Sequence, residues 1–153
     1  MINIVYASEM GTAFELALDF EKKVQDQGIE VECGEMDDYT VQQLSEMENV
    51  MMLCSTTGDG DVPMMGENFW EELESSDVDL SNVNYSLCAL GDSSHATFCG
   101  AGRKIDARMQ ELGAKVVLQR HECDADTEGS EQWAESLIKI FANTDQEYEE
   151  IHE

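Results

Sequence analysis

Short runs of apolar and β-branched residues alternate along this chain with longer segments in which apolar residues recur every three to four positions. The short runs predict five strands, at Ile2–Ala7, Glu30–Cys33, Val50–Ser55, Asn84–Leu90 and Lys115–Leu118. In the first longer segment the apolar positions form one helical face that stops at Gly28, and these positions are Ala13, Leu16, Ala17, Phe20 and Val24. Further helices are predicted at Val41–Met47, Asn68–Leu73, Ala101–Leu112 and Glu131–Asn143.

This alternation predicts an α/β fold, a doubly wound three-layer sandwich with a five-stranded parallel sheet. A common strand order for such a sheet is 2-1-3-4-5, and ligands then bind beyond the carboxyl ends of strands 1 and 3. With 153 residues the chain is expected to form one domain over residues 1–144, followed by an acidic, solvated C-terminal tail over 145–153.

Three loops rich in Gly, Ser and Thr follow the predicted strands 1, 3 and 4. Their sequences are Ser8-Glu9-Met10-Gly11-Thr12-Ala13, Ser55-Thr56-Thr57-Gly58-Asp59-Gly60-Asp61 and Leu90-Gly91-Asp92-Ser93-Ser94-His95. Such residues let backbone N–H groups and hydroxyls approach a ligand closely. The first loop leads directly into a helix, whose free N–H groups favour a phosphate. Together the loops predict a mononucleotide site.

The charge is extreme, with 34 Asp and Glu against 8 Lys and Arg, a net charge of −26. It excludes nucleic acid and anionic membranes as partners, since both repel such a surface. Two interpretations stay open: steering toward a basic protein partner, or a solvated acidic surface suited to a salty cytoplasm.

Targeting signals and cysteine spacing indicate where the protein is located and what its cysteines do. The chain has no apolar run of about 18 residues and no signal peptide at its start, so a cytoplasmic location is expected. Its five cysteines are an odd number and are widely spaced, so the sequence does not indicate a disulfide framework. No two of them have the spacing of metal ligands, so it does not indicate a metal site either. Cys54 and Cys88 lie within strands and are expected in the core.

Other nucleotide and phosphate motifs do not match. No Lys follows the first loop, so it is not a Walker loop, and Gly58-Asp59-Gly60 leads to Pro63 rather than to the third Gly of a dinucleotide fingerprint. A response-regulator receiver domain needs acidic residues after strands 1 and 3 and a Lys after strand 5. Here Ser8-Glu9, Ser55-Thr56 and Arg120-His121 stand at those places.

From Ile2 to Phe141 the chain resembles the flavodoxin-like FMN-binding proteins, including MioC-type small flavodoxins and the FMN domains of diflavin reductases such as the sulfite reductase flavoprotein. The most specific segments are Ser55-Thr56-x-Gly58-x-Gly60-Asp61 and Leu90-Gly91-Asp92-Ser93-Ser94-x-x-x-Phe98-Cys99. The run Leu112-Gly113-Ala114-Lys115 also looks like this family.

The resemblance implies a role for each loop and no catalytic or metal-binding residue. The FMN phosphate would be held by Ser8, Glu9, Met10, Gly11, Thr12 and Ala13. One face of the isoalloxazine ring would lie along Ser55, Thr56, Thr57, Gly58, Asp59 and Gly60. The other face and the pyrimidine edge would contact Leu90, Gly91, Asp92, His95, Phe98 and Cys99. Asp124 and Asp126 match an acidic loop after strand 5 that lies near the flavin in relatives.

Three positions depart from the family pattern. Met10 replaces a Thr of the phosphate loop, which removes one hydroxyl donor. Thr57 and His95 stand where relatives often have Tyr. Two interpretations of His95 stay open: it stacks on the flavin as an imidazole, or it is a solvated loop histidine. Gly58 suits one-electron chemistry, because a glycine peptide can flip to present its carbonyl to the protonated N5 of a semiquinone.

The predicted function is that of an FMN-dependent one-electron carrier, a flavodoxin that passes through the flavin semiquinone. It would shuttle electrons from a separate flavodoxin reductase to an acceptor enzyme, docking as a monomer on their basic surfaces. It would be an electron-transfer protein more than an enzyme. The alternative is a flavodoxin-fold interaction module with weak or lost FMN binding, which Met10 and Thr57 would favour.

Overall fold

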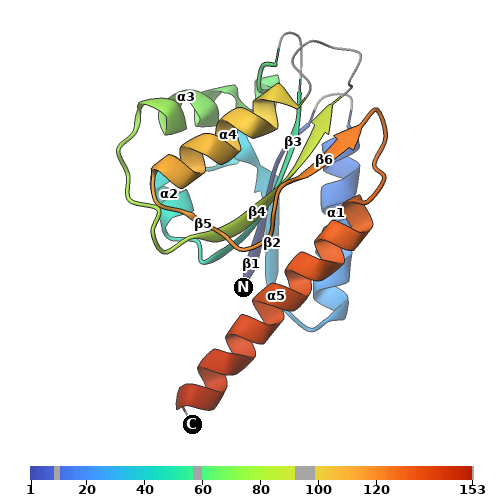
Figure 1. The fold of residues 1–153 in the computed structure, drawn as a ribbon, viewed down its shortest axis with the longest axis vertical. Coiled ribbons are helices and arrows are strands. Elements are labelled where there is room, and N and C mark those ends of the chain that lie inside the picture. Colours follow the sequence, from blue (N-terminus) through green and yellow to red (C-terminus); the bar gives the residue numbers. More distant parts are fainter. Residues whose placement is uncertain (9–10, 57–59, 92–98, 153) are drawn as a thin grey trace.

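The fold, seen in a computed structural model, is a parallel β-sheet between two layers of helices (Figure 1). The structure describes residues 1–8, 11–56, 60–91 and 99–152, with side chains as far as residue 143. The strands are β1 (Ile2–Ala7), β2 (Val31–Glu35), β3 (Asn49–Ser55), β4 (Asn84–Gly91), β5 (Lys115–Val116) and β6 (His121–Asp124). The α-helices are α1 (Thr12–Asp26), α2 (Val41–Ser45), α3 (Glu67–Ser75), α4 (Gly100–Glu111) and α5 (Ser130–His152). Two 3-10 helices that the pattern did not predict are η1 (Met36–Asp38) and η2 (Met64–Gly66).

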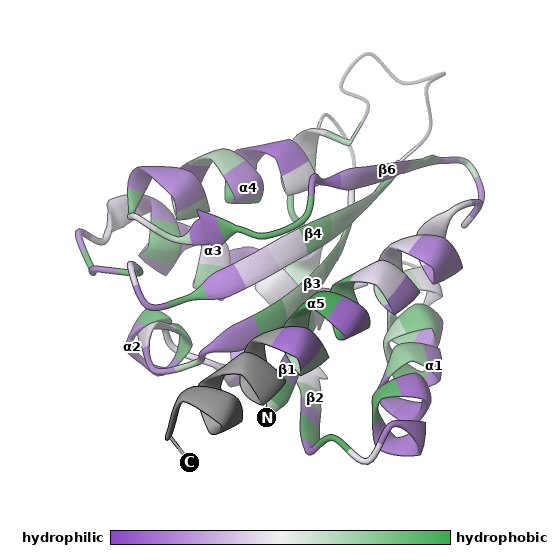
Figure 2. Cartoon of the chain, turned by 60° about the horizontal axis from the view of Figure 1, so that its bottom comes forward, coloured by the Kyte–Doolittle hydropathy of each residue, from purple (hydrophilic) through white to green (hydrophobic). Residues whose placement is uncertain are grey.

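The strand order is β2-β1-β3-β4-β5, with every pairing parallel, which confirms the predicted doubly wound α/β fold. Helices α1 and α5 cover one face of the sheet, and α2, α3 and α4 cover the other (Figure 1). Each face has its own apolar cluster, because alternate residues of the buried central strands point to opposite sides. Figure 2 shows the hydrophobic residues gathered in the middle of the molecule and β6 as mainly hydrophilic.

The predicted apolar face of α1 packs onto β1 and β3. Ala13, Ala17, Phe20 and Val24 are buried, whereas Leu16 is only half-buried at the edge of the cluster. Cys54 and Cys88 are fully buried, as expected. Tyr85 is also a core residue, and its hydroxyl donates to Asp106 Oδ1 of α4 at 2.5 Å.

The predicted fifth strand at Lys115–Leu118 is confirmed only at Lys115–Val116, and a second short strand, β6, continues this position of the sheet. Tyr85 pairs with Val116 but Cys88 pairs with His121, so three steps along β4 correspond to five along the neighbouring chain. The extra residues form a bulge where Ser86 Oγ donates to the Leu118 carbonyl at 2.8 Å, and Val117 and Leu118 stay packed against an apolar cluster there. The fifth position of the sheet is therefore filled by β5 and then by β6, which ends at Asp124. Asp124 is thus a strand residue, not part of the loop in which it was expected.

Several element ends also differ from their predictions. β2 extends to Glu35 rather than ending at Cys33, and α2 stops at Ser45. The largest difference is α5, which was expected to end at Asn143 but continues to His152. Apolar periodicity ends where α5 leaves the sheet, so the pattern could not report the rest of this helix (Figure 1). Within the described residues, no helix is both long enough and apolar enough to cross a membrane.

Candidate functional site

The register of the sheet aligns the carboxyl ends of four strands along one edge. Ala7 of β1 pairs with Cys54 of β3, Ser55 of β3 with Leu90 of β4, and Gly91 of β4 with Asp124 of β6. The three predicted loops therefore leave the sheet from neighbouring strand ends, at the edge where α1 and α4 begin (Figure 1).

The first loop joins β1 to α1. Ser8 is buried, and its Oγ has no hydrogen-bond partner among the described residues. Gly11 is the N-cap of α1 with φ 86°, a left-handed conformation that favours glycine, and its carbonyl accepts from Glu15 N at 2.9 Å. An unpartnered hydroxyl beside the positive end of a helix forms a site for an anionic group such as a phosphate.

The second loop follows β3 and also begins with a buried hydroxyl group that has no hydrogen-bond partner among the described residues. Ser55 is buried, and the Oγ1 of the half-buried Thr56 is a second buried hydroxyl oxygen without a partner in the described part of the chain. A buried polar group without a hydrogen bond costs about 1–3 kcal/mol, and most such groups have a partner. Two of them at neighbouring strand ends, on either side of the point where the strand order reverses, fit a polar ligand that supplies the missing bonds.

The third loop begins at Gly91 of β4 and returns to α4 at Cys99. A Cβ at Gly91 would lie 2.8 Å from the backbone N of Cys99, so the two ends of the loop are in direct contact. The Cys99 thiol is buried, 3.7 Å from the Ala89 carbonyl oxygen, and this burial raises its pKa to about 11. Its thiol thus packs into the protein and anchors the start of α4.

A charged network fastens α4 to β6 below this loop. Arg103 donates to both carboxylate oxygens of Glu122, at 2.7 and 2.9 Å. Arg120 donates to Glu122 at 3.1 Å and also to Asp106 of α4. The hydrogen bond from Arg103 is the main reason that the pKa of Glu122 lies below its ordinary value.

Sequence reasoning missed this network. The only signal was that five of the eight basic residues fall within residues 103–120, namely Arg103, Lys104, Arg108, Lys115 and Arg120.

The segment after β6 is tied to the third loop. Ala125, with φ 60°, donates its N–H to the Gly91 carbonyl at 2.7 Å. His121 Nε2 lies 2.8 Å from the Glu128 carbonyl oxygen and holds the far end of the turn. The exposed Asp124 thus stands beside Gly91 at the same edge.

Eight predicted site residues lie outside the described residues: Glu9, Met10, Thr57, Gly58, Asp59, Asp92, His95 and Phe98. Ten of the others lie at the carboxyl edge of the sheet or at the first turns of α1 and α4, and these are Ser8, Gly11, Thr12, Ala13, Ser55, Thr56, Leu90, Gly91, Cys99 and Asp124. Gly60 lies in the turn before η2, with φ 95°. Their individual contacts with a cofactor stay predictions.

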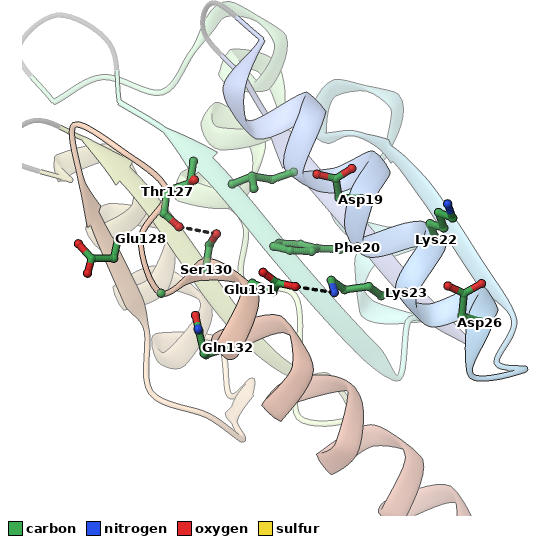
Figure 3. Close-up of a pocket in the computed structure, with 12 residues that line it drawn as sticks. Asp19, Phe20, Lys22, Lys23, Asp26, Thr127, Glu128, Ser130, Glu131 and Gln132 are labelled. Carbon is green, nitrogen blue, oxygen red and sulfur yellow. Dashed lines mark hydrogen bonds and ion pairs between the residues drawn. The ribbon is translucent and has the colours of Figure 1, made fainter.

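A separate hollow of about 620 Å³ lies between α1 and the start of α5 (Figure 3). Phe20 lines it, and Lys23 reaches across it to Glu131 at 3.0 Å. None of the predicted site residues lines it, and its mixed charges do not match a phosphate site. The candidate site is therefore the carboxyl edge of the sheet.

Comparison with known proteins agrees with this geometry. The family model described as Flavodoxin matches residues 4–136. The chain is 34% identical over 140 residues to a protein named sulfite reductase [NADPH] flavoprotein alpha-component from Bacillus subtilis, and 37% identical over 139 residues to one from Shewanella sp. (strain MR-7). In both cases 90% of this chain is covered but only 23% of the relative, so the chain spans about a quarter of their length.

Comparison with solved structures also finds flavodoxins. A C101A mutant of flavodoxin from Pseudomonas aeruginosa is 27% identical, with a TM-score of 0.76 over 93% of this chain and 96% of the other. A flavodoxin from Streptococcus pneumonia TIGR4, 24% identical, shares the fold with a TM-score of 0.80 over 94% and 98% of the two chains. The chain therefore belongs to the flavodoxin family, whose membership implies FMN as the cofactor.

Proposed function

We propose that this protein is an FMN-dependent one-electron carrier, which takes electrons from a reductase and passes them to an acceptor protein. The observation that carries the proposal is the pair of buried, unpartnered hydroxyls at Ser8 and Thr56, next to the N-terminus of α1, in a chain of the flavodoxin family. These groups fit a phosphorylated ligand at the edge where the strand order reverses.

In this proposal each described group has a binding task. Ser8 Oγ and the N–H groups of Gly11, Thr12 and Ala13 donate to the phosphate. Thr56 would donate to a polar atom further along the cofactor, and the loops that follow β3 and β4 would hold the flavin ring. FMN supplies the redox chemistry, while the protein fixes its position and its electrostatic surroundings.

Negative charge is the main electrostatic influence at this edge. Asp124 is exposed beside Gly91, and the whole chain carries a net charge of −26. A first electron taken up together with a proton would leave the charge of the flavin unchanged, whereas a second electron taken up without a proton would add a negative charge, so Coulomb repulsion from the carboxylates would oppose the second electron more than the first. The reduction potential for the second electron would therefore be lower than that for the first, which favours the transfer of one electron at a time.

The partners would be redox proteins with basic surfaces, since opposite charge speeds their encounter. The relatives named as sulfite reductase flavoproteins support an electron-transfer role for the related segment, and a reductase and an acceptor enzyme are the partner classes that we propose. All five cysteines are free thiols, which favours a reducing compartment such as the cytoplasm.

The test is a titration of the purified chain with FMN, in which binding is measured as quenching of the flavin fluorescence. Riboflavin is the control ligand. We expect a one-to-one complex with FMN and much weaker binding of riboflavin, which lacks the phosphate. Equal affinities for the two ligands, or no quenching by either, would contradict the proposal.

A further inference from the structure

The amino ends of the strands, which lie at the opposite end of the sheet from the three loops (Figure 1), border a second hollow of about 400 Å³. The residues of this hollow that matter for its chemistry are Asn3, Glu32, Tyr39, Glu46, Met47 and Glu48. None of the predicted cofactor-binding residues lines it, and no Lys, Arg or His is among the described residues that do. We call it the amino-end hollow.

Asn3 of β1 is the most buried polar side chain in the amino-end hollow, with only 7% of its surface exposed. Its amide makes no hydrogen bond to any other residue that the structure describes. Most buried amides have a partner, and leaving one without a bond costs about 1–3 kcal/mol. A ligand that enters the hollow can supply the missing bond.

Carboxylates flank Asn3 on both sides. Asn3 pairs with Glu32 of β2, so their Cα atoms lie about 4.8 Å apart and their side chains share one face of the sheet. On the other side β1 pairs with β3, and Glu48 directly precedes β3. Glu46, the C-cap of α2, adds a third carboxylate. All three are exposed and can turn toward a bound cation.

Tyr39 and Met47 give the hollow an aromatic and an apolar surface. A Cβ at Gly34 would lie 2.6 Å from Tyr39 Oη, so the tyrosine packs directly on β2. Its hydroxyl lies 3.5 Å from Glu32 Oε1. Burial, and then the charge of Glu32, raise the pKa of Tyr39 to about 12, so the hydroxyl keeps its proton. Met47 is buried, and both side chains can contact the alkyl part of a cation.

Three carboxylates around an amide that lacks a partner favour a cationic ligand. A single metal ion does not fit, because no three acidic, His or Cys side chains among the described residues are grouped closely enough to hold one. An aliphatic polyamine carries several ammonium groups joined by short alkyl chains, so it can reach separated carboxylates one by one.

We propose that the amino-end hollow binds an aliphatic polyamine. The amide oxygen of Asn3 accepts from one ammonium group, the three glutamates balance the charge, and the alkyl chain lies against Tyr39 and Met47. This site is separate from the carboxyl edge of the sheet, so the proposal does not depend on FMN binding.

The test is calorimetry of the full chain with spermidine in 0.15 M KCl, where a screening length of about 8 Å weakens the general attraction of a polycation to the acidic surface. We expect saturable one-to-one binding. Glu32→Gln combined with Glu48→Gln is expected to weaken it about tenfold, or 1.4 kcal/mol. The matched control is Glu67→Gln combined with Glu71→Gln on α3, which changes the net charge equally at exposed residues outside the hollow. Its affinity is expected to stay within about twofold of wild type.

Asn3→Leu tests the role of the amide. We expect about tenfold weaker spermidine binding, while the free chain keeps or gains stability in urea unfolding, because an amide without a partner is removed. Butylamine, which has one ammonium group, and Mg²⁺ are each expected to bind at least about tenfold more weakly than spermidine.

Equal spermidine affinities of the two double variants would overturn the proposal, because the attraction would then come from overall charge. A wild-type chain without saturable binding would overturn it too, as would butylamine or Mg²⁺ binding as tightly as spermidine. If Asn3→Leu does not fold, the two double variants decide the question.

Discussion

The hydroxyl of Ser8 shows how a single residue can be unfavourable for folding and favourable for binding. It is buried without a hydrogen-bond partner in the described structure, at a strand end followed by the N-terminus of α1. Ser86 provides the contrast: its Oγ donates to the Leu118 carbonyl at 2.8 Å and accepts from Trp133 Nε1 at 2.9 Å. One buried serine is thus satisfied by the fold, and the other is left for a ligand.

We predict opposite effects of removing these two hydroxyls. Ser8→Ala is expected to keep or raise the stability of the FMN-free chain, by up to about 1 kcal/mol, and to weaken FMN binding by about 1.5–3 kcal/mol, since a hydrogen bond to a charged group is lost. Ser86→Ala is expected to lose about 1–3 kcal/mol of stability, because the Trp133 indole loses its acceptor, with FMN affinity unchanged. Urea unfolding and FMN titration check both. A loss of stability in Ser8→Ala with normal FMN affinity would contradict the assignment.

For single residues, the sequence predicted those features that depend on residue type and on position next to a strand. Ser8, Gly11 and Thr56 were identifiable because small polar residues follow strands, and the structure places them at one edge. The bond between Arg103 and Glu122 was not predictable, because it joins a helix to a strand through tertiary packing.

Among the elements, α4 determines how the third loop returns to the protein. A Cβ at Gly102 would lie 2.5 Å from Ala89 Cβ, so the helix packs on β4 as closely as glycine allows. Strands and helices of this core were predictable from apolar periodicity. The break between β5 and β6 was not, because the bulge is set by Ser86 and the neighbouring strand rather than by local pattern.

Gly102→Ala tests this close packing. Overpacking costs about 1–3 kcal/mol, against about 1 kcal/mol gained in helix propensity, so we expect a net loss of stability together with weaker FMN binding as α4 moves. Ala107→Gly, on the exposed side of the same helix, is expected to lose about 1 kcal/mol through propensity alone. Thermal unfolding and FMN titration distinguish them. Equal FMN affinities of the two variants would show that the position of α4 does not matter for the loop.

The ion pair between α4 and β6 gives a pH dependence. In the folded chain the Arg103 hydrogen bond lowers the pKa of Glu122 below its ordinary value of 4.5. Its stabilising contribution is therefore fully present above pH 4.5 and is lost as the pH falls through the folded-state pKa. We expect the stability difference between wild type and Glu122→Gln to be largest at neutral pH and to vanish in acid.

The control for Glu122→Gln is Glu111→Gln, which makes the same change in net charge. Glu111 forms an exposed pair with Arg108 at 2.9 Å, and its side chain is 62% exposed. Exposed pairs contribute about 0–1 kcal/mol. If both variants show the same pH profile in urea unfolding, the bond from Arg103 is not what links α4 to β6.

For the whole molecule, the net charge of −26 opposes both folding and the binding of a phosphate. Salt shortens the screening length from about 10 Å at 0.1 M to about 3 Å at 1 M. We therefore expect the melting temperature and the FMN affinity both to rise when KCl is raised over this range, with riboflavin affinity changing less. A phosphate site dominated by local basic residues would instead weaken with salt, and that result would contradict this view of the surface.

In the proposed function, FMN binds at the carboxyl edge of the sheet and exchanges single electrons there. An anaerobic spectroelectrochemical titration of the FMN-loaded chain tests it most directly. We predict that the bound flavin takes up two electrons in two separate one-electron steps, the second at a potential more negative than that of free FMN. A single two-electron step at the potential of free FMN would contradict the account.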